Sequence, residues 1–168
     1  MVSASKSRTL IRVAVIDFIL LAAICLVPAL SHLAAFPFYN LNPMLLCLLL
    51  SMALVNNRYN SLLMAVLLPF VSMLICGMPT FERMVCMVAE LSTIVALYGV
   101  VFKGKNRMLS LFTSIVAGKI VYYLLKYAIV SPSLLVTTNW VVQLLVVTAY
   151  VLFFEFIVRV TSKSAMHK

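Results

Sequence analysis

Long apolar runs, each bounded by charged or turn-forming residues, recur along the whole chain of 168 residues. An α-helix needs about 20 apolar residues to cross the hydrocarbon core of a bilayer. The runs are continuous rather than alternating, so they favour helices over the strands of a membrane barrel. The sequence therefore predicts an all-α integral membrane protein with six transmembrane helices, at about 13–34, 43–55, 61–77, 84–102, 108–130 and 139–158.

The composition excludes a soluble fold. Hydrophobic residues make up 65% of the chain and charged residues 10%, against about 45–50% and 25% in soluble domains. A chain this short cannot enclose so much apolar surface in a core, so the remainder must face a lipid bilayer. Six spans of about 20 residues leave no room for a soluble domain. Residues 1–168 are therefore expected to form one membrane domain.

The basic residues indicate the orientation of the helices, because cytoplasmic loops of membrane proteins are enriched in Lys and Arg. The loops predicted on one side, around 35–42, 78–83 and 131–138, hold only Arg83. Both termini are then cytoplasmic, and the protein is a multi-pass protein of the cell (inner or cytoplasmic) membrane. Ten of the 13 basic residues fall on the other side: Lys6, Arg8, Arg12, Arg58, Lys103, Lys105, Arg107, Arg159, Lys163 and Lys168.

Two other interpretations of the charge pattern are less favourable. A net charge of +9 could indicate a nucleic-acid partner, but the cations form short clusters between apolar runs and no continuous patch. The first apolar run could belong to a signal peptide, but it exceeds the usual core of about 7–15 residues. Removing it would also spoil the sorting of charges. We expect no nucleic-acid partner and a retained first helix.

Ionisable residues inside the spans form two layers, and such residues often mark a ligand pathway because lipid penalises their charge. In the inner layer, Asp17 and Glu155 lie level with Arg12 and Arg159. Glu155 and Arg159 are spaced i,i+4, which predicts an ion pair within one helix.

The outer layer is richer in polar groups. Glu90 and Lys119 are expected at similar depths, and Lys126 lies two turns further out on the same helix face as Lys119. We predict that this layer surrounds a substrate-binding cavity. The alternative is structural, with Glu90 and Lys119 neutralising each other, aromatic residues anchoring the interface and Asn139 capping a helix. The candidate binding residues are Glu90, Lys119, Tyr122, Tyr123, Lys126, Asn139, Trp140, Gln143 and Asn40.

The segment 35–43 is apolar and aromatic although it connects two spans. We expect it to fold back onto the bundle, with Phe36, Phe38 and Tyr39 as a lid over the cavity; an ordinary interfacial belt is the alternative. The helix that follows, at 43–55, is short for a bilayer of about 30 Å. Short or proline-interrupted segments often point to a membrane binding site.

Motifs for catalysis are missing from the sequence. It has no HExxH, no paired-glutamate motif, no Walker motif and no Ser or Cys beside a candidate base. His32 is the only histidine in the membrane region, and the four cysteines, which lack metal-site spacing, are predicted to be packing residues. We expect no enzyme activity, no cofactor and no metal, so energy for any transport would come from another chain.

Several sequence blocks together resemble the S components of energy-coupling factor (ECF) vitamin transporters, which are six-helix proteins of about this length. After the proline-containing outer loop and the basic turn comes Gly77-Met78-Pro79, followed by Met87-Val88-Ala89-Glu90-Leu91 and Tyr98-Gly99. Ala117-Gly118-Lys119-Ile120-Val121-Tyr122 resembles the family's G-R-x-x-Y pattern. Lysine stands where the family has arginine and lacks its planar fork. The first helix also lacks a strict A-x-x-x-A docking motif, since Leu26 follows Ala22 at that spacing and only Cys25 with Ala29 supplies small residues.

The resemblance implies capture of a vitamin or vitamin precursor in the outer half and docking onto a transmembrane coupling subunit served by two ATPase subunits. It does not choose among folate, pantothenate, biotin, lipoate, riboflavin and thiamine. The alternatives from other classes are a structural or assembly membrane subunit without a ligand, and an intramembrane enzyme.

Overall fold

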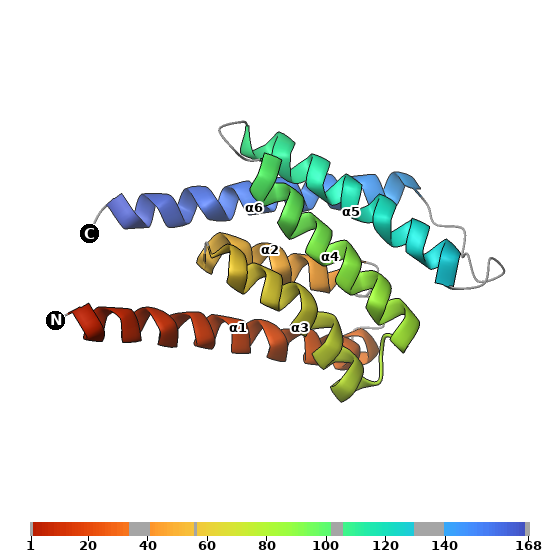
Figure 1. The fold of residues 1–168 in the computed structure, drawn as a ribbon, viewed down its shortest axis with the longest axis horizontal. Helices are drawn as coiled ribbons and strands as arrows, with labels where there is room; N and C mark the ends of the chain where they lie inside the picture. The colour runs from red at the N-terminus through yellow and green to blue at the C-terminus, as the bar shows by residue number, and fades with distance from the viewer. Residues whose placement is uncertain (1, 34–40, 56, 102–105, 130–139, 167–168) are drawn as a thin grey trace.

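A computed structural model describes residues 2–33, 41–55, 57–101, 106–129 and 140–166 (Figure 1). In these ranges the backbone is helical apart from short turns, with no strand. The helices are α1 (Val2–Leu33), α2 (Pro43–Val55), α3 (Arg58–Cys76), α4 (Phe81–Val101), α5 (Arg107–Ile129) and α6 (Trp140–Met166).

The all-helical prediction is confirmed, and the bounds of α2 agree with the predicted span. The helices at the two ends of the chain are longer than the spans predicted within them, because α1 begins at Val2, before the span at 13–34, and α6 continues to Met166, past the span at 139–158. An apolar run identifies only the part of a helix that can lie in the hydrocarbon core of a bilayer. The backbone hydrogen bonds of the helix can continue into the polar residues on either side. Both terminal helices therefore extend past their apolar parts.

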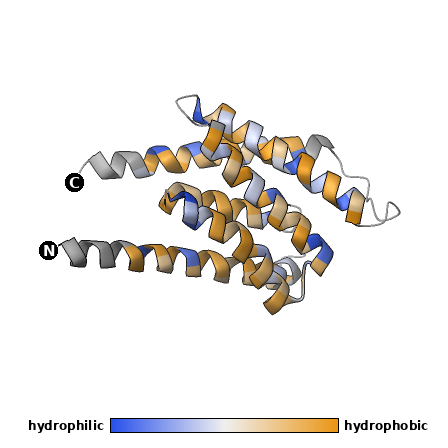
Figure 2. Cartoon of the chain, in the orientation of Figure 1, coloured by the Kyte–Doolittle hydropathy of each residue, from blue (hydrophilic) through white to orange (hydrophobic). Residues whose placement is uncertain are grey.

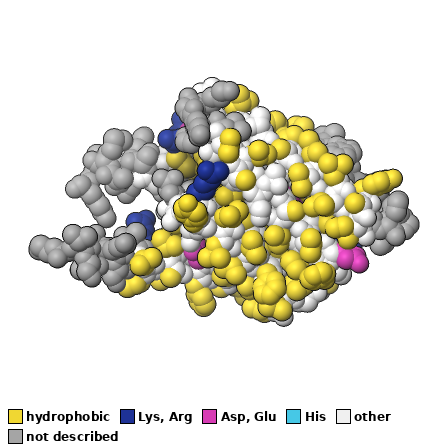
Figure 3. Space-filling model, in the orientation of Figure 1, with side chains coloured by type: hydrophobic (Ala, Val, Ile, Leu, Met, Phe, Trp, Pro, Cys, Tyr) yellow, Lys and Arg dark blue, Asp and Glu magenta, His cyan; other side chains and the backbone are white. Residues whose placement is uncertain are grey.

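Successive helices alternate in direction, so the start of α1 and the end of α6 lie at the same end of the bundle (Figure 1). The end of α2, the start of α3, the end of α4 and the start of α5 also lie at this end. It carries Arg58, Arg107 and Arg159, and we call it the basic end. Lys and Arg side chains gather toward it in the space-filling view (Figure 3). The sorting of these cations that the sequence predicted is present in the fold.

The short helix α2 lies against three others, α1, α3 and α6, while α4 packs between α3 and α5. Leu45, Leu48 and Leu49 of α2 are almost completely buried. All six helices contribute side chains to one apolar core. Cys47 and Cys86 are buried, as expected of packing residues.

Hydrophobic residues run along all six helices (Figure 2), and their side chains cover much of the face of the bundle seen in Figure 3. Phe18 on α1, Leu74 on α3 and Phe156 on α6 are more than 60% exposed. Among the described residues, five helices are long and apolar enough to cross a membrane. Helix α2 has 13 residues and reaches only about 20 Å at 1.5 Å per residue. The described helices have the character of a multi-pass membrane protein.

Residues with suitable backbone chemistry set the ends of α3. Asn57 caps its start, since the side-chain oxygen accepts a hydrogen bond from Tyr59 N at 3.0 Å. Gly77 ends it in the left-handed conformation (φ 67°) and donates its N–H to the Met73 carbonyl oxygen at 3.0 Å. Glycine suits this position because it carries no Cβ that would oppose a positive φ. Asn57 and Gly77 therefore fix the two ends of α3.

Candidate functional site

Helices α4 and α5 lie in close contact at Gly118. A Cβ at this position would lie 2.5 Å from Ile94 Cγ1 and 3.1 Å from the Glu90 carbonyl oxygen. Only a residue without a side chain permits that spacing. The next residue on α5, Lys119, is thereby brought directly beside α4.

Lys119 and Glu90 form a buried ion pair across this contact. The distance from Lys119 Nζ to Glu90 Oε1 is 2.7 Å, and the side chains are 18% and 3% exposed, respectively. Glu90 Oε1 has no other polar partner among the described residues. The prediction that Glu90 and Lys119 lie at similar depths is confirmed. The two charges neutralise each other directly, without a group from another molecule.

Two tyrosines extend this site along α5. Lys119 Nζ lies 5.7 Å from the centre of the Tyr122 ring, within the range of a cation–π interaction. Tyr122 and Tyr123 make an edge-to-face contact, with ring centres 5.4 Å apart. Lys126 is half-buried in the last turn of α5 and forms no ion pair with any described residue. The structure therefore joins Glu90, Lys119, Tyr122 and Tyr123 in one continuous group, which we call the α4–α5 polar site.

The remaining predicted binding residues are not joined to this site. Gln143 is half-buried in the first turns of α6, and within the described part of the chain no hydrogen bond connects it to Glu90 or Lys119. Trp140 begins α6, but its side chain lies outside what the structure describes. The same is true of the predicted binding residues Asn40 and Asn139 and of the predicted lid residues Phe36, Phe38 and Tyr39.

The inner layer contains a second polar cluster, which the sequence did not reveal. Asp17 Oδ1 on α1 accepts hydrogen bonds from Asn60 Nδ2 on α3, at 3.1 Å, and from Ser51 Oγ on α2, at 3.4 Å. Asn60 was expected in a loop, but it lies in the first turns of α3 with a half-buried side chain. The signal that was available is Ser51, a polar residue in an otherwise apolar run.

Asn60→Ala is expected to lower the free energy of unfolding by about 1.5–3 kcal/mol, the range for a hydrogen bond to a charged group. The loss arises because Asp17 keeps only the longer contact with Ser51. Titration of the purified protein with a denaturing detergent measures it. Thr148→Val is the control, since the exposed Thr148 hydroxyl only donates to Leu144 of its own helix. Equal stability of the two variants would contradict the role of this cluster.

The predicted ion pair within α6 is confirmed, with Arg159 Nε 2.9 Å from Glu155 Oε1. At the same end, the Arg58 guanidinium of α3 donates to the Ala96 carbonyl oxygen of α4 at 3.2 Å. Gly99 makes room for it, because a Cβ there would lie 2.6 Å from Arg58 Cζ. Arg58 therefore fastens the start of α3 to α4.

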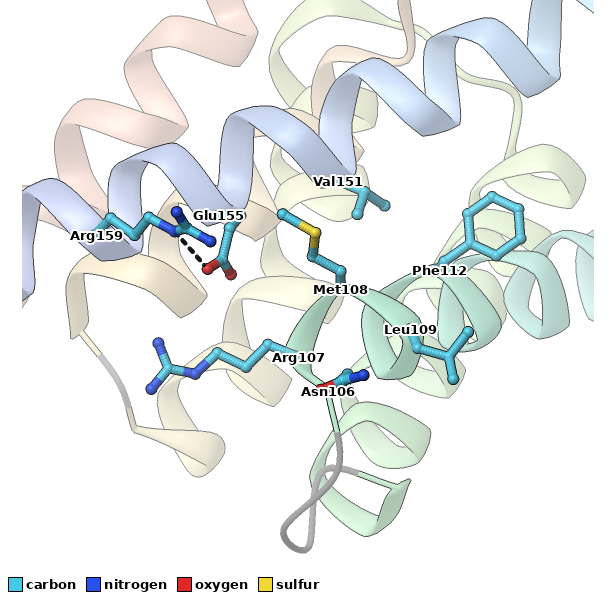
Figure 4. A pocket seen from close by; sticks show the side chains of 8 residues that line it. All are labelled: Asn106, Arg107, Met108, Leu109, Phe112, Val151, Glu155 and Arg159. Atoms are coloured by element: carbon cyan, nitrogen blue, oxygen red, sulfur yellow. Dashed lines mark hydrogen bonds and ion pairs between the residues drawn. The ribbon is translucent and has the colours of Figure 1, made fainter.

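A groove of about 530 Å³ lies between α5 and α6 at the basic end (Figure 4). It contains none of the predicted binding residues. Within the described ranges, no group of three or more His, Cys, Asp or Glu residues could hold a metal ion. The residues that line the groove are Asn106, Arg107, Met108, Leu109, Phe112, Val151, Glu155 and Arg159.

Comparisons of the chain with protein-family models, with curated proteins and with solved structures found no match. The features that remain for assigning a function are the described helices, the α4–α5 polar site and the cluster around Asp17. Together they define an all-helical protein of multi-pass membrane character with charged groups inside the bundle.

Proposed function

We propose that the chain is a membrane-embedded substrate-capture subunit, the S component of an ATP-driven ECF transporter. It binds a small vitamin or vitamin precursor at the α4–α5 polar site and delivers it inward together with a transmembrane coupling subunit and two ATPase subunits. The observation that carries the proposal is the buried ion pair between Glu90 and Lys119 beside Tyr122.

A buried ion pair is a weak source of net stability, because desolvation of both ions offsets their attraction. The same groups are well suited to recognition. A carboxylate on a ligand competes with Glu90 for the Lys119 ammonium, and a ligand amide or amine donates to Glu90. The Tyr122 ring supplies an aromatic face beside both charges. The site thus fits a small polar molecule with an anionic group and a planar part.

The proposal includes six membrane crossings with both termini in the cytoplasm of the cell membrane. Two observations support this orientation. The start of α1 and the end of α6 lie at the same end of the bundle, and Arg58, Arg107 and Arg159 lie at that end as well. The positive-inside rule assigns such an arginine-rich end to the cytoplasm. The short α2 then crosses as an enclosed helix, shielded from lipid by the three helices around it.

A thermal-denaturation screen of the purified protein tests the capture function. The panel is folate, pantothenate, biotin, lipoate, riboflavin and thiamine, each added separately. One compound is expected to raise the melting temperature, because a ligand at 100 times its Kd stabilises the folded state by about 2.7 kcal/mol.

The effect of that compound is expected to disappear in Tyr122→Leu and to persist in Tyr127→Leu. Both tyrosines are on α5, but Tyr127 is 64% exposed, whereas Tyr122 is half-buried beside Lys119. A panel without any stabilising compound, or equal loss in the two variants, would argue against the α4–α5 polar site as a binding site.

A second candidate function is that of a structural or assembly membrane subunit. The closed ion pair favours it, because Glu90 and Lys119 already satisfy each other's charge without a ligand. Mass spectrometry of the protein purified from membranes distinguishes the two candidates. A retained small metabolite supports capture, whereas retained partner subunits without a metabolite support assembly.

A further inference from the structure

The groove between α5 and α6 has a polar side and an apolar side. Figure 4 shows Arg107, Glu155 and Arg159 gathered on one side, with Leu109 and Phe112 on the other. Arg107 comes from the first turn of α5, and Glu155 and Arg159 come from the second half of α6. Two helices therefore combine charged and apolar surface in one groove.

The depth of the groove in the bundle matches a membrane boundary. Arg107 begins one of the described segments that are long and apolar enough to cross a membrane, Arg107–Ile129, and Arg159 lies near the end of another, Gln143–Thr161. The charged side thus falls where lipid headgroups lie, and the apolar side falls where acyl chains begin.

The charges of the lining favour a singly anionic group. The described lining contains two guanidinium groups, those of Arg107 and Arg159, and one carboxylate, that of Glu155, which lies 2.9 Å from Arg159. The lining is left with a formal charge of +1, and 70% of the Arg159 side chain remains exposed. Guanidinium groups bind phosphate through directed pairs of hydrogen bonds.

We propose that this groove binds an anionic phospholipid of the phosphatidylglycerol class. Its phosphate lies between the Arg107 and Arg159 guanidinium groups, and the upper part of an acyl chain packs on Leu109, Phe112 and Val151. The volume of about 530 Å³ is in the range of small-molecule pockets, about 300–1,000 Å³. Basic pockets between helices at the cytoplasmic side are known sites for anionic headgroups. This assignment does not depend on the capture function.

Native mass spectrometry of the full-length protein, with phosphatidylglycerol or phosphatidylcholine of identical acyl chains added in turn, tests the assignment. Phosphatidylglycerol is expected to bind at least tenfold more tightly. The variants Arg107→Gln and Arg107→Gln/Arg159→Gln are expected to lose this preference. Arg83→Gln is expected to keep it, because Arg83 is an exposed arginine near the start of α4, at the other end of the bundle.

Equal binding of the two lipids, or an unchanged preference in the double variant, would overturn the proposal. Glycerol 1-phosphate, which has the phosphate but no acyl chains, distinguishes a lipid site from a simple anion site. If it binds as tightly as phosphatidylglycerol does, the proposal is also overturned. Each variant is first checked for wild-type helicity and elution. If the double variant does not fold, Arg107→Gln alone decides, since it leaves the ion pair between Glu155 and Arg159 in place.

Discussion

Lys119→Met is expected to lower the free energy of unfolding by about 3–5 kcal/mol, because it leaves a buried carboxylate without its counter-charge. Glu90 is 2% exposed and cannot recover this loss from water. The double variant Glu90→Gln/Lys119→Met removes both charges and is expected to regain most of the stability. Detergent-induced unfolding of the purified proteins measures both effects.

Lys126→Met is the matched control for this experiment. Lys126 lies seven residues further along α5 and has no ion-pair partner in the described ranges. Its substitution is expected to cost less than about 1 kcal/mol, because it breaks no ion pair and leaves no buried charge unpaired. If Lys119→Met is as stable as Lys126→Met, the buried ion pair does not exist in the membrane protein.

The double variant Glu90→Gln/Lys119→Met also shows whether the ion pair only stabilises helix packing or takes part in binding the vitamin. A folded Glu90→Gln/Lys119→Met protein that no longer responds to the stabilising vitamin places the charges in the binding site. A folded protein with unchanged vitamin binding restricts them to helix packing and leaves the capture site elsewhere.

Gly118→Ala is expected to destabilise the protein by about 1–3 kcal/mol, the usual cost of overpacking. The new methyl group would meet Ile94 at 2.5 Å and the Glu90 carbonyl oxygen at 3.1 Å, so α4 and α5 must separate. Because Lys119 follows directly, the ion pair lengthens as well. Thermal unfolding of the purified variant measures the loss.

Gly99→Ala is the control, because both substitutions gain about 1 kcal/mol of helix propensity. The added Cβ at position 99 meets only the end of the flexible Arg58 side chain, which can move aside with the loss of its exposed hydrogen bond to Ala96. Its stability is expected to stay within about 1 kcal/mol of the wild type. Equal losses in the two variants would show that Gly118 is not a special point of contact.

Features that depend on position along a single helix could be predicted from the sequence. The apolar runs located all six helices, and the i,i+4 spacing predicted the Glu155–Arg159 pair. The approximate depths of Glu90 and Lys119 placed them near each other. These inferences require only helix geometry and the preference of lipid for apolar side chains.

Features that depend on which helices are neighbours could not be predicted. The contacts of Asp17 with Ser51 and Asn60 need α1, α2 and α3 to meet at one level. Periodicity within each helix does not contain that information, because the helices are apolar on nearly all sides. The groove between α5 and α6 likewise depends on how two separate helices are placed.

The cluster around Asp17 has a consequence for α1, whose surface is otherwise largely open. An apolar helix can rotate about its axis at little cost when lipid and apolar neighbours offer similar environments on every side. Hydrogen bonds to Asn60 and Ser51 remove that freedom, because a small rotation would carry Asp17 away from both donors. The Asp17 carboxylate thus fixes the rotation of α1 about its own axis, whereas apolar packing alone would allow several rotations of similar energy.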